Sequence, residues 1–98
     1  MLLNKVRYAL RVDGTDLDED INDNIDACKA DLKLSGVVKI KDDDPLIIQA
    51  IKTYARAYFD VDNPDHDKYV ASYESLKMHL SLAEEYTVEV VQDEGNEA

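Results

Sequence analysis

Carboxylates that could bind a metal ion are concentrated in one early stretch of the chain. Asp16, Asp18 and Asp20 have the spacing of the first ligands in an EF-hand calcium loop. Such a loop also needs Gly at its sixth position, for a sharp turn, and Glu at its last, which binds the ion through both oxygens. Ile21 and Ala27 occupy these positions, and other registers fail in the same way. We therefore expect no metal site, and a solvated acidic helix face instead.

Histidine and cysteine, the other common ligands and nucleophiles, are sparse. Asp65-His66-Asp67 looks like a fragment of a metal site, but no second His or Cys follows at ligand spacing. Cys28 falls on an apolar helical stripe and is predicted to be a small core residue. A single Cys also excludes an internal disulfide. Neither a catalytic Ser/His/Asp order nor a glycine-rich phosphate loop is present, so we expect no enzyme and no cofactor.

The distribution of charge limits the partners that the chain can bind. Net charge is −11, with −1 in residues 1–41 and −10 in residues 42–98. One basic cluster is visible, and we interpret it as a solvated face: Lys29, Lys33, Lys39 and Lys41. An acidic surface disfavours tight DNA binding, which needs phosphate contacts from Lys and Arg. We predict no sequence-specific nucleic-acid binding, but DNA could pass nearby without adhering.

The stretch from Asp44 to Phe59 predicts the helix around which the other elements pack. Asp44 can cap the free N–H groups, and Pro45 suits the first helical position. At roughly 100° per residue, its polar side chains share one narrow sector: Gln49, Lys52, Thr53 and Arg56. The remaining arc is apolar and wider than the stripe of an ordinary surface helix. We therefore expect neighbours on two or three sides of this helix.

Three further helices are predicted to surround it. The first spans Leu2 to Leu10, and Gly14 in the following break can adopt positive φ. The second spans Asp16 to about Leu34, with Thr15 or Asp16 as its cap. Its apolar stripe is Leu17, Ile21, Ile25, Cys28 and Leu32, and its outward acids are Glu19, Asp20, Asp23, Asp26 and Asp31. The last spans about Asp67 to Ala83, with its main stripe formed by Tyr69, Tyr73, Leu76, Leu80 and Ala83. Most tyrosines of these helices are expected to pack in the core with their hydroxyls at the surface.

The last helix carries a second apolar strip on nearly the opposite side, formed by Ala71, Met78 and Leu82. A helix at the edge of a small bundle needs only one buried stripe. The strip could contact another subunit, or it could lie under the C-terminal segment. Within that segment, Thr87, Val88, Val90 and Val91 are β-prone. They could pair with residues 37–40 or add to a neighbouring chain.

These patterns predict an all-α fold, a small bundle of four helices around a central buried helix with a short C-terminal extended segment. Residues 1–86 form the helical domain, and residues 87–98 form an extended arm with an acidic tail. At 98 residues the core is modest, so self-association would add stability. Apolar runs are too short for a membrane span or a secretory signal, so we expect no membrane association.

The chain resembles the small helical head–tail connector (adaptor) proteins of long-tailed bacteriophages and prophages, which are also labelled DNA-packaging proteins. Segments that carry the resemblance cover most of residues 1–83 in order: Val6 to Gly14, Asp16 to Ala27, Asp44 to Ile51, Tyr54 to Tyr58, and Tyr73 with Leu76. The resemblance implies a structural virion protein at the head–tail junction, assembled in the host cytoplasm. It implies a homo-oligomeric ring under the portal protein, which extends the DNA channel and supports a stopper or tail-completion protein. An isolated subunit could be monomeric.

Two further hypotheses follow from the charge. Acids of the second helix could line the channel and let DNA slide through it. Alternatively, a compact acidic helical protein could mimic DNA and regulate a DNA-binding enzyme. The interface of a ring subunit is expected at Ala71, Met78 and Leu82 and in the segment from Thr87 to Val91.

Overall fold

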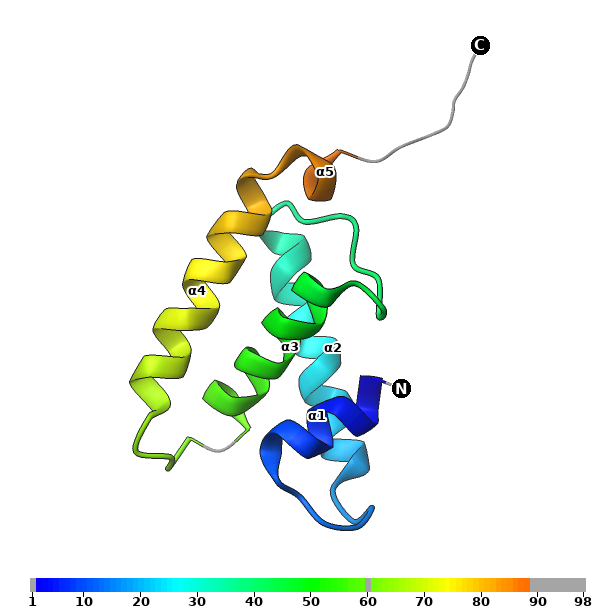
Figure 1. Ribbon diagram of the computed structural model, residues 1–98, viewed down its shortest axis with the longest axis vertical. Helices are drawn as coiled ribbons and strands as arrows, with labels where there is room; N and C mark the ends of the chain where they lie inside the picture. Colours follow the sequence, from blue (N-terminus) through cyan, green and yellow to red (C-terminus); the bar gives the residue numbers. More distant parts are fainter. Residues whose placement is uncertain (1, 60, 89–98) are drawn as a thin grey trace.

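The computed structural model describes residues 2–59 and 61–88 of the chain, and this part is helical without any strand (Figure 1). Five helices follow one another: α1 (Leu2–Leu10), α2 (Asp18–Leu34), α3 (Pro45–Tyr58), α4 (His66–Leu82) and α5 (Glu84–Thr87). The predicted small helical bundle is confirmed. The short helix α5 is an addition that the sequence patterns did not indicate.

Helix α3 lies at the centre of the bundle, as predicted. Its start is fixed by Asp44, whose Oδ1 accepts hydrogen bonds from the N–H groups of Leu46 at 2.9 Å and Ile47 at 3.3 Å. Helices α1, α2 and α4 all pack against α3. Its fully buried side chains are Ile47, Ala50, Ile51, Ala55 and Ala57. Three alanines and one threonine among its buried positions let the neighbouring helices approach closely.

Three side chains of α3 differ from the helical-wheel expectation. Thr53 was expected in the polar sector but is only 4% exposed. Its hydroxyl donates to the carbonyl of Gln49 at 2.8 Å, which satisfies the buried oxygen within the helix. Leu46 and Tyr58, expected on the covered arc, are 48% and 39% exposed. Both lie in the terminal turns of the helix.

Helix α2 begins two residues later than predicted, and neither Thr15 nor Asp16 caps it. Leu17 stands at the cap position without a side-chain hydrogen bond and is 38% exposed. Instead, Arg7 of α1 fixes the first turn of α2 by binding both carboxylate oxygens of Asp18, at 2.7 and 2.8 Å. The other four residues of the predicted stripe are buried: Ile21, Ile25, Cys28 and Leu32.

Helix α2 ends in a Schellman turn at Gly36, which has φ +100°. Its N–H donates to Lys33 at 3.0 Å, and the N–H of Val37 donates to Leu32 at 3.0 Å. Val37 and Leu32 are both fully buried. The turn therefore satisfies the last carbonyls of α2 and directs the chain back into the core.

Helix α1 ends in the same kind of turn, but with Arg11 in the position that glycine usually takes. Arg11 has φ +58° and is the one non-glycine residue with positive φ in the part of the chain that the structure describes. Its N–H donates to Tyr8 and the N–H of Val12 donates to Arg7, both at 3.1 Å. Gly14 has φ +79°, as its place in the break predicted.

Helix α5 closes the bundle at the end where α2 gives way to the α2–α3 loop (Figure 1). Tyr86 is 8% exposed, and its carbonyl accepts hydrogen bonds from the N–H groups of Val38 at 2.8 Å and Lys39 at 3.2 Å. Its phenol donates to the Asp44 carboxylate, 3.0 Å from each oxygen. Up to Val88, the C-terminal part of the chain thus meets residues 37–40 through one tyrosine and without a ladder of strand pairs. Thr87, expected to be extended, is the last residue of α5, whereas Val88 has extended backbone angles.

Candidate functional site

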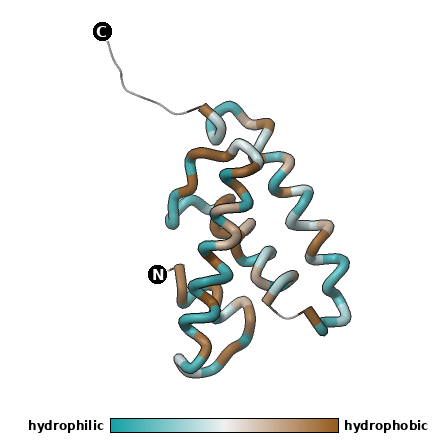
Figure 2. Tube along the Cα trace, turned by 180° about the vertical axis from the view of Figure 1, so that it is seen from behind, coloured by the Kyte–Doolittle hydropathy of each residue, from teal (hydrophilic) through white to brown (hydrophobic). Residues whose placement is uncertain are grey.

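The second apolar strip of α4, formed by Ala71, Met78 and Leu82, lies open to solvent. Met78 is 61% exposed and Leu82 is 78% exposed, and Ala71 is also exposed. Figure 2 shows hydrophobic positions recurring along the helices. Helix α5 and Val88 leave the strip uncovered. Of the two alternatives for this strip, the part of the C-terminal segment up to Val88 therefore does not provide its cover.

The predicted interface residues of the C-terminal segment differ from one another in exposure, and two of them are not described by the structure. Thr87 is half-buried at the end of α5, and Val88 is 50% exposed. Val90 and Val91 lie outside the described residues. The structure thus brings the three residues of the α4 strip together, whereas the C-terminal segment begins at the end of the molecule where α4 ends.

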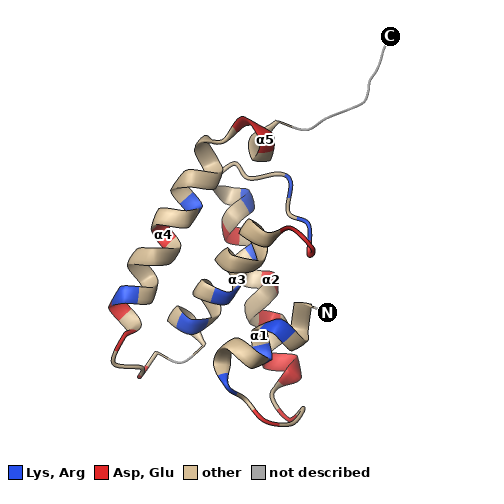
Figure 3. Cartoon of the chain, viewed as in Figure 1, with Lys and Arg blue, Asp and Glu red and all other residues tan. Residues whose placement is uncertain are grey.

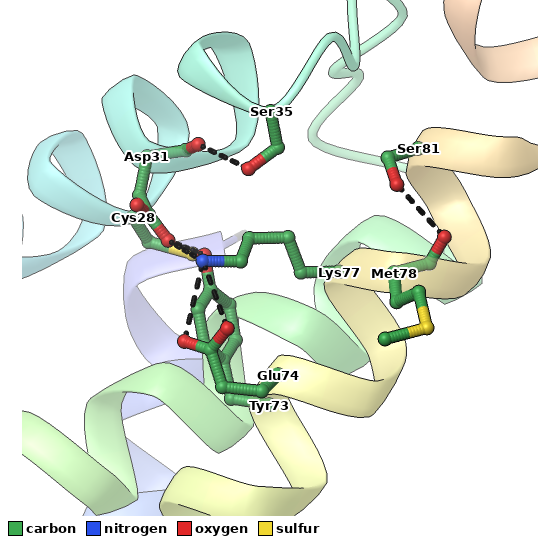
Figure 4. A network of polar contacts seen from close by, with 8 residues as sticks. All are labelled: Cys28, Asp31, Ser35, Tyr73, Glu74, Lys77, Met78 and Ser81. Atoms are coloured by element: carbon green, nitrogen blue, oxygen red, sulfur yellow. Dashed lines mark hydrogen bonds and ion pairs between the residues drawn. The ribbon is translucent and has the colours of Figure 1, made fainter.

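A polar cluster on the inner side of α4 holds the helix against α2 (Figure 4). The phenol of Tyr73 donates to Oδ2 of Asp31 at 2.7 Å. Nζ of Lys77, one turn further along α4, donates to the same oxygen at 3.0 Å and pairs with Glu74 at 3.1 Å. Tyr73 is fully buried, and the ring of Tyr54 meets it edge-on with centroids 5.0 Å apart. We name Asp31, Tyr73 and Lys77 the α2–α4 brace.

The ionisation of the brace is fixed by its contacts. Burial acts to raise the pKa of Asp31, but the hydrogen bonds from Tyr73 and Lys77 outweigh it and hold that pKa below its ordinary value. For Lys77, burial acts to lower the pKa, but the contacts with Asp31 and Glu74 raise it overall. Burial, with the hydrogen bond to Asp31, raises the pKa of Tyr73 well above its usual range. At neutral pH the brace is a carboxylate held by a neutral phenol and an ammonium group.

Cys28 lies next to the brace, in an environment that disfavours reactions of its thiol. Its side chain is fully buried, and its Sγ lies 3.8 Å from the Tyr73 phenol oxygen. Burial, the largest cause, raises the pKa of the thiol to about 12. Because the thiolate is the nucleophile, this environment suits a structural cysteine, as the sequence pattern predicted.

Asp31 is the residue of this region that the sequence reasoning placed wrongly. It was assigned to the outward acids of the second helix, yet it is half-buried and accepts both contacts of the brace. A signal was available, because Lys77 stands one turn after Tyr73, a member of the main apolar stripe, and on nearly the same side of the helix. A lysine that is only 18% exposed needs an anionic partner nearby.

The remaining candidates for chemistry are engaged in local structure. Nδ1 of His66 lies 2.7 Å from the carbonyl of Ala57, so this nitrogen carries the hydrogen and donates it. Lys29, from the predicted basic cluster, pairs with Asp42 at 2.7 Å. Basic and acidic side chains are interspersed over the helices (Figure 3). Within residues 2–59 and 61–88, no three His, Cys, Asp or Glu side chains are grouped as a metal site would require.

A family model described as "Phage connector protein" matches residues 2–87, which is nearly the whole chain. No curated protein and no solved structure matches the chain. Among the described helices, none combines the length and apolar character that crossing a membrane requires.

Proposed function

The chain belongs to the phage connector protein family, and from this premise we propose that it forms a ring at the head–tail junction, docked under the portal protein. The family is one of structural proteins, so the chain is a structural connector of a phage particle. In the proposed role the ring extends the DNA channel and provides the binding surface for a stopper or tail-completion protein. The match over residues 2–87 is the observation that carries this proposal.

The exposed strip on α4 supports a role in subunit or portal contacts. Side chains that are 61% and 78% exposed at Met78 and Leu82 give the small domain apolar surface that a neighbour can cover. The α2–α4 brace holds the opposite side of the same helix. Subunit contacts through such a strip would compensate for a modest core.

The experiment is to mix the purified protein with the cognate portal assembly and to image the complexes by electron microscopy. We expect a ring of density on the portal with wild-type protein and a loss of at least ten-fold in occupancy with the double variant Met78→Glu, Leu82→Glu. Val61→Glu is the matched control, because Val61 is 59% exposed and lies outside the strip. Absence of wild-type density on the portal would refute the proposed role, and full occupancy by the double variant would refute the assignment of the strip.

The acids of α2 fit the proposed channel lining. Glu19, Asp20, Asp23 and Asp26 are exposed along one helix, so they could face DNA without displacing its counterions. The variant Asp23→Asn, Asp26→Asn is expected to slow ejection of DNA from assembled particles, whereas Asp65→Asn, Asp67→Asn is not. Equal ejection rates for all three proteins would count against an acidic lining.

A further inference from the structure

A pocket of about 480 Å³ opens where the end of α1 meets the end of α3 and the start of α4. Arg11 and Arg56 line it, together with the rings of Phe59 and Tyr69 and the side chain of Asn63. In Figure 3 the basic residues at the ends of α1 and α3 lie at the same end of the molecule. No carboxylate among the described residues pairs with either arginine. On a chain of net charge −11, two such guanidinium groups beside aromatic rings suit an anionic ligand.

Arg56 is held in place at this pocket. Its Nε donates to the carbonyl of Ala9 at 3.4 Å, and its guanidinium carbon lies 5.8 Å from the centre of the Tyr69 ring. Both contacts leave the two terminal nitrogens without a partner among the described residues. These nitrogens form the side of the guanidinium fork that binds a carboxylate with two parallel hydrogen bonds.

Arg11 reaches the pocket from a backbone conformation that arginine rarely adopts. The Schellman turn that ends α2 has Gly36 at the corresponding position, whereas the turn that ends α1 has Arg11 there. Arginine at positive φ strains the backbone, and such strain is often retained where a side chain has a function. The pocket gives a reason for a charged side chain at this turn, because Arg11 and Arg56 both line it.

A peptide carboxylate fits this site better than nucleic acid. Stable DNA binding rests on many phosphate contacts, and two arginines on a strongly acidic protein supply few. A short acidic peptide needs only one or two paired carboxylates. The rings of Phe59 and Tyr69 offer apolar contact for the aliphatic part of such a segment.

The chain itself contains a segment of this chemistry. Residues 89–98 include Glu89, Asp93, Glu94 and Glu97 and no basic residue. Helix α5, from which the chain continues to this segment, lies at the end of the molecule opposite the pocket (Figure 1). A contact between the C-terminal segment of one copy and the pocket of the next is therefore head-to-tail, the type of interface that closes into a ring when the rotation allows.

We infer that the Arg11–Arg56 pocket binds the acidic C-terminal segment, residues 89–98, of a second copy of this chain. The inference rests on the proposed ring, and it names the contact by which one subunit follows another around it.

The test titrates full-length protein into a fluorescently labelled peptide of residues 87–98 and follows fluorescence anisotropy. Wild-type protein is expected to bind saturably, and Arg11→Gly and Arg56→Gln each to weaken binding at least ten-fold. Lys33→Gln removes an exposed charge from α2 and serves as the control with unchanged affinity. A peptide with all four acids replaced by their amides should bind at least ten-fold more weakly. Equal binding by Arg11→Gly, equal binding of the neutral peptide, or no saturable binding would each overturn the assignment.

Reversing the charges of both the pocket and the peptide distinguishes a loss of binding from misfolding of the variant. Arg11→Glu with Arg56→Glu should lose the acidic peptide and gain a peptide in which the four acids are lysines, provided that circular dichroism shows native helicity. A single-stranded oligonucleotide that competes more strongly than the acidic peptide would overturn the inference in favour of nucleic acid.

A mixed-label NMR sample separates two copies from one. A spin label on Ala98→Cys in unlabelled chains should broaden the Asn63 signals of ¹⁵N-labelled chains without the label. Broadening only when label and isotope are in the same chain would overturn binding to a second copy. These measurements need no portal. If they fail while normal rings form on the portal, the pocket assignment is rejected and the proposed function stands. If the peptide binds but no rings form on the portal, the proposed function is rejected and the pocket assignment stands.

Discussion

The phenol of Tyr73 donates a 2.7 Å hydrogen bond to Asp31, and this partly buried bond joins α4 to α2. The carboxylate also receives Lys77, so the exposed α4 strip is presented by a helix whose inner side is held by a charge-assisted network. The consequences for stability can be measured without knowledge of the partners.

Replacement of Tyr73 by Phe should lower the free energy of unfolding by roughly 1.5–3 kcal/mol, the usual range for a hydrogen bond to a charged group. The ring still fills its place in the core, so the loss reports the bond to Asp31. Urea unfolding followed by circular dichroism at neutral pH measures it. Tyr69→Phe is the control, because the Tyr69 hydroxyl has no hydrogen bond among the described residues, and it should change stability by less than about 0.5 kcal/mol. Equal midpoints for both variants would contradict the role of the brace.

The brace also predicts a dependence of stability on acid pH. Although burial acts to raise the pKa of Asp31, the hydrogen bonds from Tyr73 and Lys77 hold it below the unfolded value. As pH falls, the unfolded chain binds the proton first, so the stabilisation is complete above the unfolded pKa and is lost as pH falls through the folded pKa. Asp31→Asn should therefore be less stable than wild type at pH 7, and the difference should shrink below about pH 4. Denaturation curves from pH 7 to pH 3 test this, with Asp26→Asn as the exposed control on the same helix. A difference that is constant over this range would exclude the linkage.

Cys28 should resist alkylation in the folded protein. Burial raises the pKa of its thiol to about 12, so the thiolate at pH 8 is scarcer than in an ordinary cysteine by on the order of a thousand-fold. Iodoacetamide labelling followed by mass spectrometry should modify an exposed cysteine introduced by Ala30→Cys within minutes, with Cys28 labelled only in urea. Comparable rates for both thiols under native conditions would show that the core opens readily.

The two Schellman turns predict opposite responses to substitution. A Cβ added at Gly36 meets no atom within 4 Å, so Gly36→Ala introduces only the strain of positive φ, about 1 kcal/mol of destabilisation. Arg11→Gly relieves the same strain, although glycine gains freedom in the unfolded chain, and the net gain lies between zero and about 1 kcal/mol. Thermal unfolding of both variants measures whether each substitution raises or lowers the stability of the protein. A destabilised Arg11→Gly would mean that the arginine is retained for stability and not for the pocket.

Much of the fold was predictable because it depends on local rules. Asp44 followed by Pro45 marks the start of α3, and the wide apolar arc after it requires neighbours on several sides. The bounds of α1 were also correct, because Gly14 and the residues around it interrupt the helix pattern. These features arise from periodicity and capping, which a single sequence displays.

The parts that were missed depend on tertiary contacts. Asp31 lies on the outward edge of its own helix, and only the approach of Tyr73 and Lys77 makes it an interior partner. Leu17 completes an apolar stripe in the sequence. In the structure, however, Arg7 binds Asp18, and the helix starts at Asp18, so that Leu17 lies before it. Arg11 could not be recognised as a turn residue, because the sequence rule assigns that position to glycine. The pocket follows from the meeting of three helix ends, which no local pattern encodes.

Tyr86 connects the C-terminal side of the chain to Asp44, and Asp44 also caps α3. A force on the chain beyond Val88 is therefore passed in part through the Tyr86 phenol to the first turn of the central helix. A partner that binds this end is therefore linked to the middle of the bundle through Tyr86, whose carbonyl also accepts hydrogen bonds from Val38 and Lys39.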